Sequence, residues 1–131
     1  MNEDLKALIN YRLQKARETL RDAHLLLEGG GSPESVINRA YYAMFYAVLA
    51  LLTRIGKGAA KHSGVIALFD RHFVKSGLFP KQMSKAIHRA FELRQLGDYR
   101  EFISLDREQA EGLLRLAESF VREVEKYFQK E

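Results

Sequence analysis

The chain has 131 residues, carries a formal net charge of +4 and contains no cysteine. This length suffices for one hydrophobic core, so we expect a single domain over residues 1–131. The lack of cysteine excludes disulfides, thiolate nucleophiles and thiolate metal sites. The basic residues are interspersed with acidic ones, a pattern that fits a nucleic-acid partner and equally an ordinary solvated surface.

The first residues do not follow the basic-then-apolar order of a secretory signal. The longest apolar run, residues 40–52, is too short to span a bilayer. We therefore expect a cytoplasmic protein with no membrane contact.

The first predicted helix covers residues 5–28, where apolar side chains recur at spacings of three and four. They are Ile9, Leu13, Ala16, Leu20, Ala23 and Leu27. Three glycines at 29–31 end this helix, because successive glycines disfavour helix and provide the left-handed conformation of a C-terminal cap.

The second predicted helix runs from Pro33 to about Arg54 and begins with a strong start signal. Ser32 is a good N-cap residue, and proline suits the first helical position. Nearly every residue from 36 to 52 is apolar or aromatic, which is typical of a helix buried on more than one side. We expect this helix to lie at the centre of the molecule.

Three further helices are predicted in the second half. One begins near His62 and Ser63 and ends at residues 76–77, and the next begins at Pro80 and ends at residues 96–99. The last begins near Ser104 or Asp106, and Asp106 has the spacing of a capping box with Gln109. No segment shows a sustained period of two, so the fold class is all-α. We expect an antiparallel up-and-down four-helix bundle with an additional short helix.

Aromatic residues are frequent, with 8 Phe and 6 Tyr. Buried tyrosine hydroxyls need hydrogen-bond partners. The cluster of Tyr41, Tyr42 and Tyr46 therefore predicts polar groups inside the bundle or a protein partner over this helix. Small bundles with wide apolar faces often associate, so we expect a homodimer.

Metal and cofactor chemistry find little support in the residue pattern. The four histidines are scattered, and only His88 and Glu92 have helical spacing for a shared ligand set. No serine or cysteine triad and no phosphate-binding loop with a flanking strand is visible. We expect no metal and no cofactor.

Two groups of polar residues interrupt the apolar pattern. Asn38 and Arg39 precede Tyr42 by four and three positions, so the three side chains share one helix face. Arg94 and Asp98 are four residues apart, and Tyr99 follows directly. On the residues alone, an ion pair that ties the loop to the bundle is the favoured interpretation of Arg94 and Asp98.

Three segments together resemble a known family. They are Asn38-Arg39-Ala40-Tyr41-Tyr42-Ala43-Met44-Phe45, then His62-Ser63-Gly64-Val65-Ile66, then Arg94-Gln95-Leu96-Gly97-Asp98-Tyr99. In this order and spacing the chain resembles short, stand-alone prokaryotic HEPN-domain proteins over essentially its whole length.

The resemblance implies an antiparallel helical bundle that dimerises and places polar residues in a cleft at the dimer interface. It implies a toxin–antitoxin-like pairing with a minimal nucleotidyltransferase. Many members are metal-independent ribonucleases with an arginine followed after four to six residues by a histidine. In them the arginine stabilises charge on the phosphate and the histidine does acid–base work.

This chain departs from that pattern. Arg94 matches the arginine, but Asp98 or Tyr99 stands where the histidine would fall. His62, from another part of the chain, is a candidate for the missing imidazole. The alternative for His62 is a structural role, in which it caps the third helix together with Ser63.

Three functional hypotheses follow. The leading one is a dimer that binds a nucleotide or an RNA segment through Arg39, Tyr42, His62, Arg94, Asp98 and Tyr99, with Asn38 beside them. The second is a metal-independent ribonuclease that uses Arg94 with His62 or Asp98 as catalytic residues. The third is an interaction module whose tyrosine-rich helix is only an interface.

Overall fold

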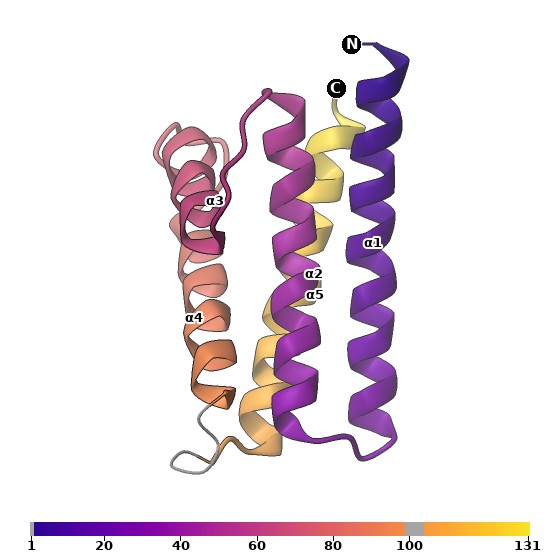
Figure 1. Cartoon of the computed structure of the whole chain (residues 1–131), viewed down its shortest axis with the longest axis vertical. Helices are drawn as coiled ribbons and strands as arrows, with labels where there is room; N and C mark the ends of the chain where they lie inside the picture. Colours follow the sequence, from indigo (N-terminus) through magenta and orange to yellow (C-terminus); the bar gives the residue numbers. More distant parts are fainter. Residues whose placement is uncertain (1, 99–103) are drawn as a thin grey trace.

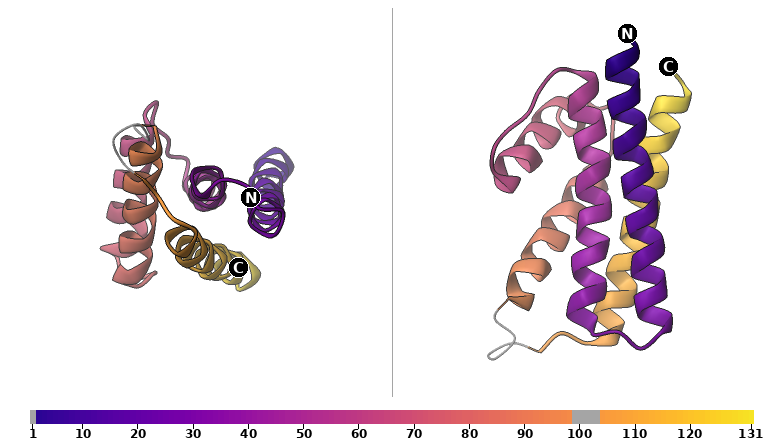
Figure 2. Two further views of the ribbon diagram at one scale, coloured as in Figure 1. Left: turned by 90° about the horizontal axis from the view of Figure 1, so that it is seen from below. Right: turned by 45° about the vertical axis from the view of Figure 1, so that its right-hand side comes forward.

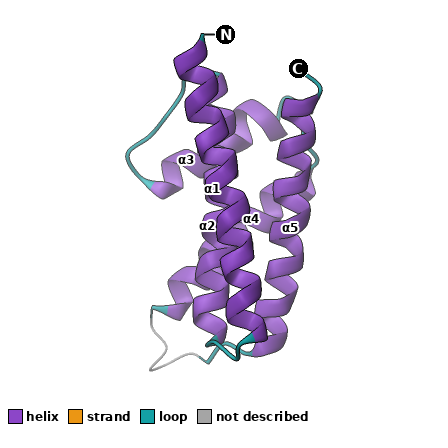
Figure 3. Ribbon diagram, turned by 90° about the vertical axis from the view of Figure 1, so that its right-hand side faces the viewer, coloured by secondary structure: helices purple, strands orange, loops and turns teal. Residues whose placement is uncertain are grey.

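A computed structural model describes residues 2–98 and 104–131. These residues form α1 (Glu3–Glu28), α2 (Pro33–Arg54), α3 (His62–Phe69), a π-helical segment η1 (Asp70–Val74), α4 (Lys81–Gly97) and α5 (Arg107–Gln129). The described part of the chain contains helices, turns and loops but no strand (Figure 3). The all-α prediction is therefore confirmed.

The helix α2 occupies the centre and packs against α1, α3, α4 and α5 (Figure 1). In the view from below, α3 and α4 lie to one side of α2 and α1 lies to the other, while α5 covers a further side (Figure 2). The apolar residues of α2 account for this position, because twelve of its side chains are buried. The predicted central role of this helix agrees with these contacts.

The length and composition of α2 would also suit a membrane span, and it is the sole such helix within the described residues. Most of its apolar stretch is buried among the other helices. The core of the molecule thus explains the apolar character that the sequence shows here.

Side-chain caps explain where α1, α2 and α5 begin. The Asn2 side chain accepts a hydrogen bond from the Leu5 N–H (2.7 Å), so α1 begins two residues before the predicted start. Ser32 accepts from the Ser35 N–H (3.1 Å) at the start of α2. At the start of α5, Asp106 and Gln109 form both hydrogen bonds of the predicted capping box (2.8 and 2.9 Å).

The region predicted as a third helix is divided between α3 and η1. The side chain of Asp70, the first residue of η1, is hydrogen-bonded to Nε2 of His88 on α4 (2.7 Å). The backbone N–H of Lys75 donates to the Asp70 carbonyl (2.8 Å), which is the wider turn of a π-helix. The apolar periodicity of residues 65–74 gave no sign of this change in helix type.

Candidate functional site: an arginine pair beside a buried tyrosine–histidine contact

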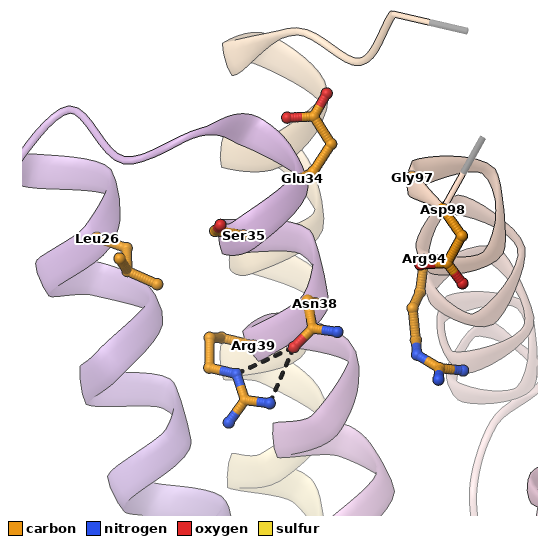
Figure 4. Close-up of a pocket in the computed structure, with 8 residues that line it drawn as sticks. All are labelled: Leu26, Glu34, Ser35, Asn38, Arg39, Arg94, Gly97 and Asp98. Atoms are coloured by element: carbon orange, nitrogen blue, oxygen red, sulfur yellow. Dashed lines mark hydrogen bonds between the residues drawn. The ribbon is translucent and has the colours of Figure 1, made fainter. Parts of the chain in front are cut away.

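A cavity of about 540 Å³ lies where α1, α2 and the end of α4 meet (Figure 4). Its lining residues are Leu26, Glu34, Ser35, Asn38, Arg39, Arg94, Gly97 and Asp98. The cap at Ser32 places Asn38 and Arg39 in the early turns of α2. Gly97 at the end of α4 lies beside the Glu34 side chain, so the N-terminal end of α2 meets the C-terminal end of α4.

Arg39 is held by a neutral neighbour. Its Nε and Nη2 atoms both donate to Oδ1 of Asn38 (3.1 and 2.9 Å). Its guanidinium carbon lies 5.2 Å from the centre of the Tyr42 ring, within the range of a cation–π contact. An amide oxygen and an aromatic face orient the guanidinium without neutralising its charge.

Arg94 approaches the same tyrosine from α4. Its guanidinium carbon lies 5.3 Å from the ring centres of both Tyr41 and Tyr42. Among the residues that the structure describes, neither Arg94 nor Arg39 forms an ion pair. The ion pair that the sequence favoured between Arg94 and Asp98 is therefore not formed, and the rings of α2 hold Arg94 instead.

Tyr41 is a site residue that the sequence reasoning did not select. Its side chain is fully buried, and its hydroxyl lies 2.8 Å from Nδ1 of His62. Burial raises the pKa of the Tyr41 hydroxyl well above its usual value, and the nearby charge of Arg94 only partly opposes this. The hydroxyl therefore keeps its proton. Because Nδ1 of His62 is the one hydrogen-bond partner of this buried hydroxyl within the described residues, the O–H donates to Nδ1. The need of a buried phenol for a partner was the one signal for this contact in the sequence.

His62 is enclosed by aromatic rings. Its ring stacks on Phe45 with 4.2 Å between ring centres and lies edge-on to Tyr42 at 5.7 Å. Burial, and then the charge of Arg94, lower the pKa of His62 below its usual value of about 6.5. The imidazole is thus neutral at pH 7. With Nδ1 accepting from Tyr41, the proton is carried by Nε2.

The alternative that His62 and Ser63 cap α3 is wrong. The N-cap of α3 is Lys61, and no side chain accepts a hydrogen bond there. His62 instead joins α3 to α2 through Tyr41. Its imidazole lines a second cavity and not the cavity that contains Arg94.

The structure brings most of the predicted site residues together. Asn38, Arg39, Arg94 and Asp98 line one cavity, and Tyr42 lies beneath the two guanidinium groups. Tyr99 lies outside the described residues. No cluster of three or more metal-ligating side chains occurs in the described ranges 2–98 and 104–131.

Two guanidinium groups from different helices favour an anion with several oxygens. A guanidinium donates pairs of parallel hydrogen bonds to phosphate or carboxylate oxygens. The Tyr42 ring lies against both guanidinium groups, and a nucleobase can stack on the flat face of a guanidinium group. Glu34 and Asp98 at the border of the cavity limit how much negative charge it accepts.

Comparisons with known proteins place the chain in a family. The HEPN domain model matches residues 9–127. A UPF0332 protein of Thermotoga maritima is 45% identical over 96% of this chain and 94% of its own length. Two proteins of Methanocaldococcus jannaschii, each with the name "Putative toxin", are 33% and 32% identical over 88% and 96% of this chain and 78% and 92% of their own lengths. The chain belongs to the HEPN domain family.

Proposed function

We propose that this chain is a toxin-like HEPN protein that binds single-stranded RNA, with Arg39 and Arg94 contacting phosphate oxygens. One observation carries the proposal. Two guanidinium groups from α2 and α4 lie 5.2 and 5.3 Å from the centre of one tyrosine ring, at a cavity of about 540 Å³. The names of the two Methanocaldococcus jannaschii relatives support the toxin-like role.

RNA fits this arrangement better than a protein carboxylate does. A nucleotide offers both a phosphate for the hydrogen-bond donors of the guanidinium groups and a base that can stack on a guanidinium plane. The net charge of +4 favours a polyanion over a neutral ligand. A free nucleotide such as ATP also has a phosphate group and a base, so it serves as a competitor in the test.

Binding is favoured over RNA cleavage by the position of the imidazole. A general acid or base must come within hydrogen-bond reach of the proton that it transfers. The Nδ1 atom of His62 is occupied by Tyr41, and His62 does not line the cavity of Arg94. Asp98 lines that cavity and is exposed, so a ribonuclease built on Arg94 and Asp98 is the second candidate.

The proposal includes the wider setting that the resemblance implies. We expect a cytoplasmic homodimer with an antiparallel up-and-down bundle of its four long helices in each copy. We also expect pairing with a minimal nucleotidyltransferase. Mass measurement in solution, and co-purification with such a partner from the same host, test these two associations.

The binding test uses a labelled single-stranded RNA and fluorescence anisotropy. We expect Arg94→Ala and Arg39→Ala each to weaken RNA binding about tenfold or more, because a charge-assisted hydrogen bond contributes roughly 1.5–3 kcal/mol and about 1.4 kcal/mol is tenfold in affinity. Unlabelled ATP should compete with the RNA. Arg89→Ala is the matched control, because Arg89 is an exposed arginine of α4 that pairs with Glu92 outside this cavity.

Two results would reject the proposal. One is equal, negligible affinity of all four proteins for RNA and ATP. The other is an equal loss in Arg89→Ala and Arg94→Ala, which would indicate unspecific charge attraction. Incubation of the RNA with the wild type in EDTA tests the second candidate, since cleavage that disappears in both Arg94→Ala and Asp98→Asn would establish a metal-independent ribonuclease.

A further inference from the structure

A second cavity, of about 570 Å³, lies toward the opposite ends of α1 and α2 and takes no part in the function proposed so far. It is enclosed by the first turns of α1, the second half of α2, the α2–α3 connection and the start of α3. Its lining residues are Leu5, Leu8, Arg12, Phe45, Leu49, Thr53, Gly56, Lys57, Gly58, Ala59, Ala60, Lys61, His62 and Val65.

All charged residues of this lining are basic. Arg12, Lys57 and Lys61 contribute three positive charges, and the lining contains no aspartate or glutamate. The described part of the chain offers no ion-pair partner to any of the three. The first cavity, in contrast, includes Glu34 and Asp98. The second cavity therefore attracts anions more strongly than the first does.

The floor of the second cavity is apolar and aromatic. Phe45, Leu49 and Leu8 are among its apolar lining residues, and the ring of His62 stacks on Phe45 at 4.2 Å. A ligand that fits such a cavity combines an anionic group for the basic side chains with a flat or apolar body for the floor. A nucleotide unit has both parts.

Tyr42 stands between the two cavities. Its ring lies 5.2 and 5.3 Å from the guanidinium groups of Arg39 and Arg94, and 5.7 and 6.1 Å from the rings of His62 and Phe45. One ring thus contacts side chains of both cavity walls.

The two cavities also share one face of α2. Asn38, Tyr42, Phe45 and Leu49 follow one another at helical spacing and lie on one side of the helix. From Arg39 to Leu49 the rise along α2 is about 15 Å. A strand of several nucleotides is long enough to reach from one cavity to the other.

The geometry points to a second RNA subsite: a strand bound at Arg39 and Arg94 continues over Tyr42 along α2 and places a further nucleotide in the cavity of Arg12, Lys57 and Lys61. This inference rests on the proposed function, since it needs an RNA strand at the arginine pair. It predicts that the affinity for RNA depends on the length of the strand. The affinity should increase once the strand is long enough to span both cavities.

The test compares single-stranded RNAs from about two to about twelve nucleotides by fluorescence anisotropy at several salt concentrations. The double variant Lys57→Ala/Lys61→Ala should bind the shortest RNA as the wild type does and should bind the longest about fivefold or more weakly. For the longest RNA, the logarithm of the binding constant of the double variant should fall less steeply with the logarithm of the salt concentration. The slope should decrease by about 0.7 for each phosphate that the protein no longer neutralises. Arg94→Ala should weaken binding at every length.

The matched control is Lys81→Ala/Lys85→Ala, which removes the same charge from exposed positions of α4 that line neither cavity. If Lys57→Ala/Lys61→Ala binds RNA of every length as the wild type does, the second subsite is overturned. A loss of affinity in Arg94→Ala in the same experiment would still support the proposed function. An equal loss in the Lys81→Ala/Lys85→Ala control would also overturn it. Failure of the wild type to bind any RNA would overturn both.

Two further outcomes identify other occupants. If free AMP competes for the second cavity and the effect of the double variant is independent of RNA length, the cavity takes a free nucleotide and the strand proposal is wrong. If the double variant changes the oligomeric mass of the protein in light scattering, the cavity is an interface between copies of the chain, and the subsite is again overturned.

Discussion

Tyr41 and His62 show how two uncharged residues organise a charged site. The buried hydroxyl and Nδ1 are 2.8 Å apart, and the Tyr41 ring in turn lies beneath Arg94. A cation–π contact is worth roughly 0.5–2 kcal/mol, so the ring orients Arg94 without consuming its hydrogen-bond donors. The hydrogen bond to His62 fixes the tyrosine ring that Arg94 needs.

The lowered pKa of His62 predicts a pH-dependent stability. The unfolded chain binds a proton at His62 near pH 6.5, about the ordinary value, whereas the folded chain binds it only at lower pH. Below about pH 6.5 the unfolded state therefore holds more protons at this position, and the free energy of unfolding falls as the pH is lowered. Urea unfolding of the wild type between about pH 7 and about pH 5 measures this loss.

His62→Asn isolates the contribution of this histidine. The amide oxygen of asparagine replaces Nδ1 as acceptor for the Tyr41 hydroxyl, but the side chain does not titrate. The other three histidines are common to both proteins, so their contributions cancel in the difference. We expect a smaller fall in stability for His62→Asn than for the wild type, and parallel pH profiles would contradict the assigned neutral state.

At the scale of single helices, the capping residues are the clearest link between sequence and structure. Ser32 and Asp106 each accept a backbone N–H of the first turn that has no partner within its helix. Each lies in a short connection, and each fixes the residue at which a long helix begins. The register of α2 set by Ser32 places Asn38 and Arg39 at the cavity.

Removal of the α5 cap should cost measurable stability. Asp106→Ala removes the acceptor for the Gln109 N–H, and we expect a loss of about 1 kcal/mol in the free energy of unfolding. Gln109→Ala removes the reciprocal hydrogen bond and should cost less. Ser119→Ala is the control, because Ser119 is exposed within α5. Equal urea midpoints for Asp106→Ala and Ser119→Ala would show that the capping box contributes nothing.

At the scale of the whole molecule, all the helices share one continuous apolar core. The buried cluster includes Leu20 of α1, Met44 of α2, Phe69 of α3, Ile87 of α4 and Phe120 of α5. A core that includes every helix of residues 2–98 and 104–131 leaves no separate interior within these ranges. The single domain over residues 1–131, expected from the length of the chain, remains a prediction.

One cooperative unfolding transition is therefore expected. The urea midpoint from far-ultraviolet circular dichroism should coincide with the midpoint from tyrosine fluorescence, as in two-state unfolding. The homodimer remains a prediction, and the same experiment addresses it, because the midpoint of a dimer rises with protein concentration. Two separated transitions would contradict the single domain, and an unchanged midpoint over a wide concentration range would contradict a stable dimer.

The sequence by itself determined where the long helices lie and where α2 and α5 begin, because caps, glycines and apolar periodicity act over a few residues. It did not show the earlier start of α1 or the division of the third predicted helix between α3 and η1. The sequence also selected Asn38, Arg39, Arg94 and Asp98, since polar side chains within an apolar pattern need a reason to be there. The roles assigned to these residues stay predictions.

Only the tertiary structure decided which side chains meet. Tyr41 and His62 are 21 positions apart, and their contact depends on the rotation of α2 relative to α3. The packing of α4 against α2 places Arg94 over two tyrosine rings, and the packing of α3 against α2 places His62 in the second cavity. Such contacts depend on how whole helices pack, and no local pattern in the sequence specifies that packing.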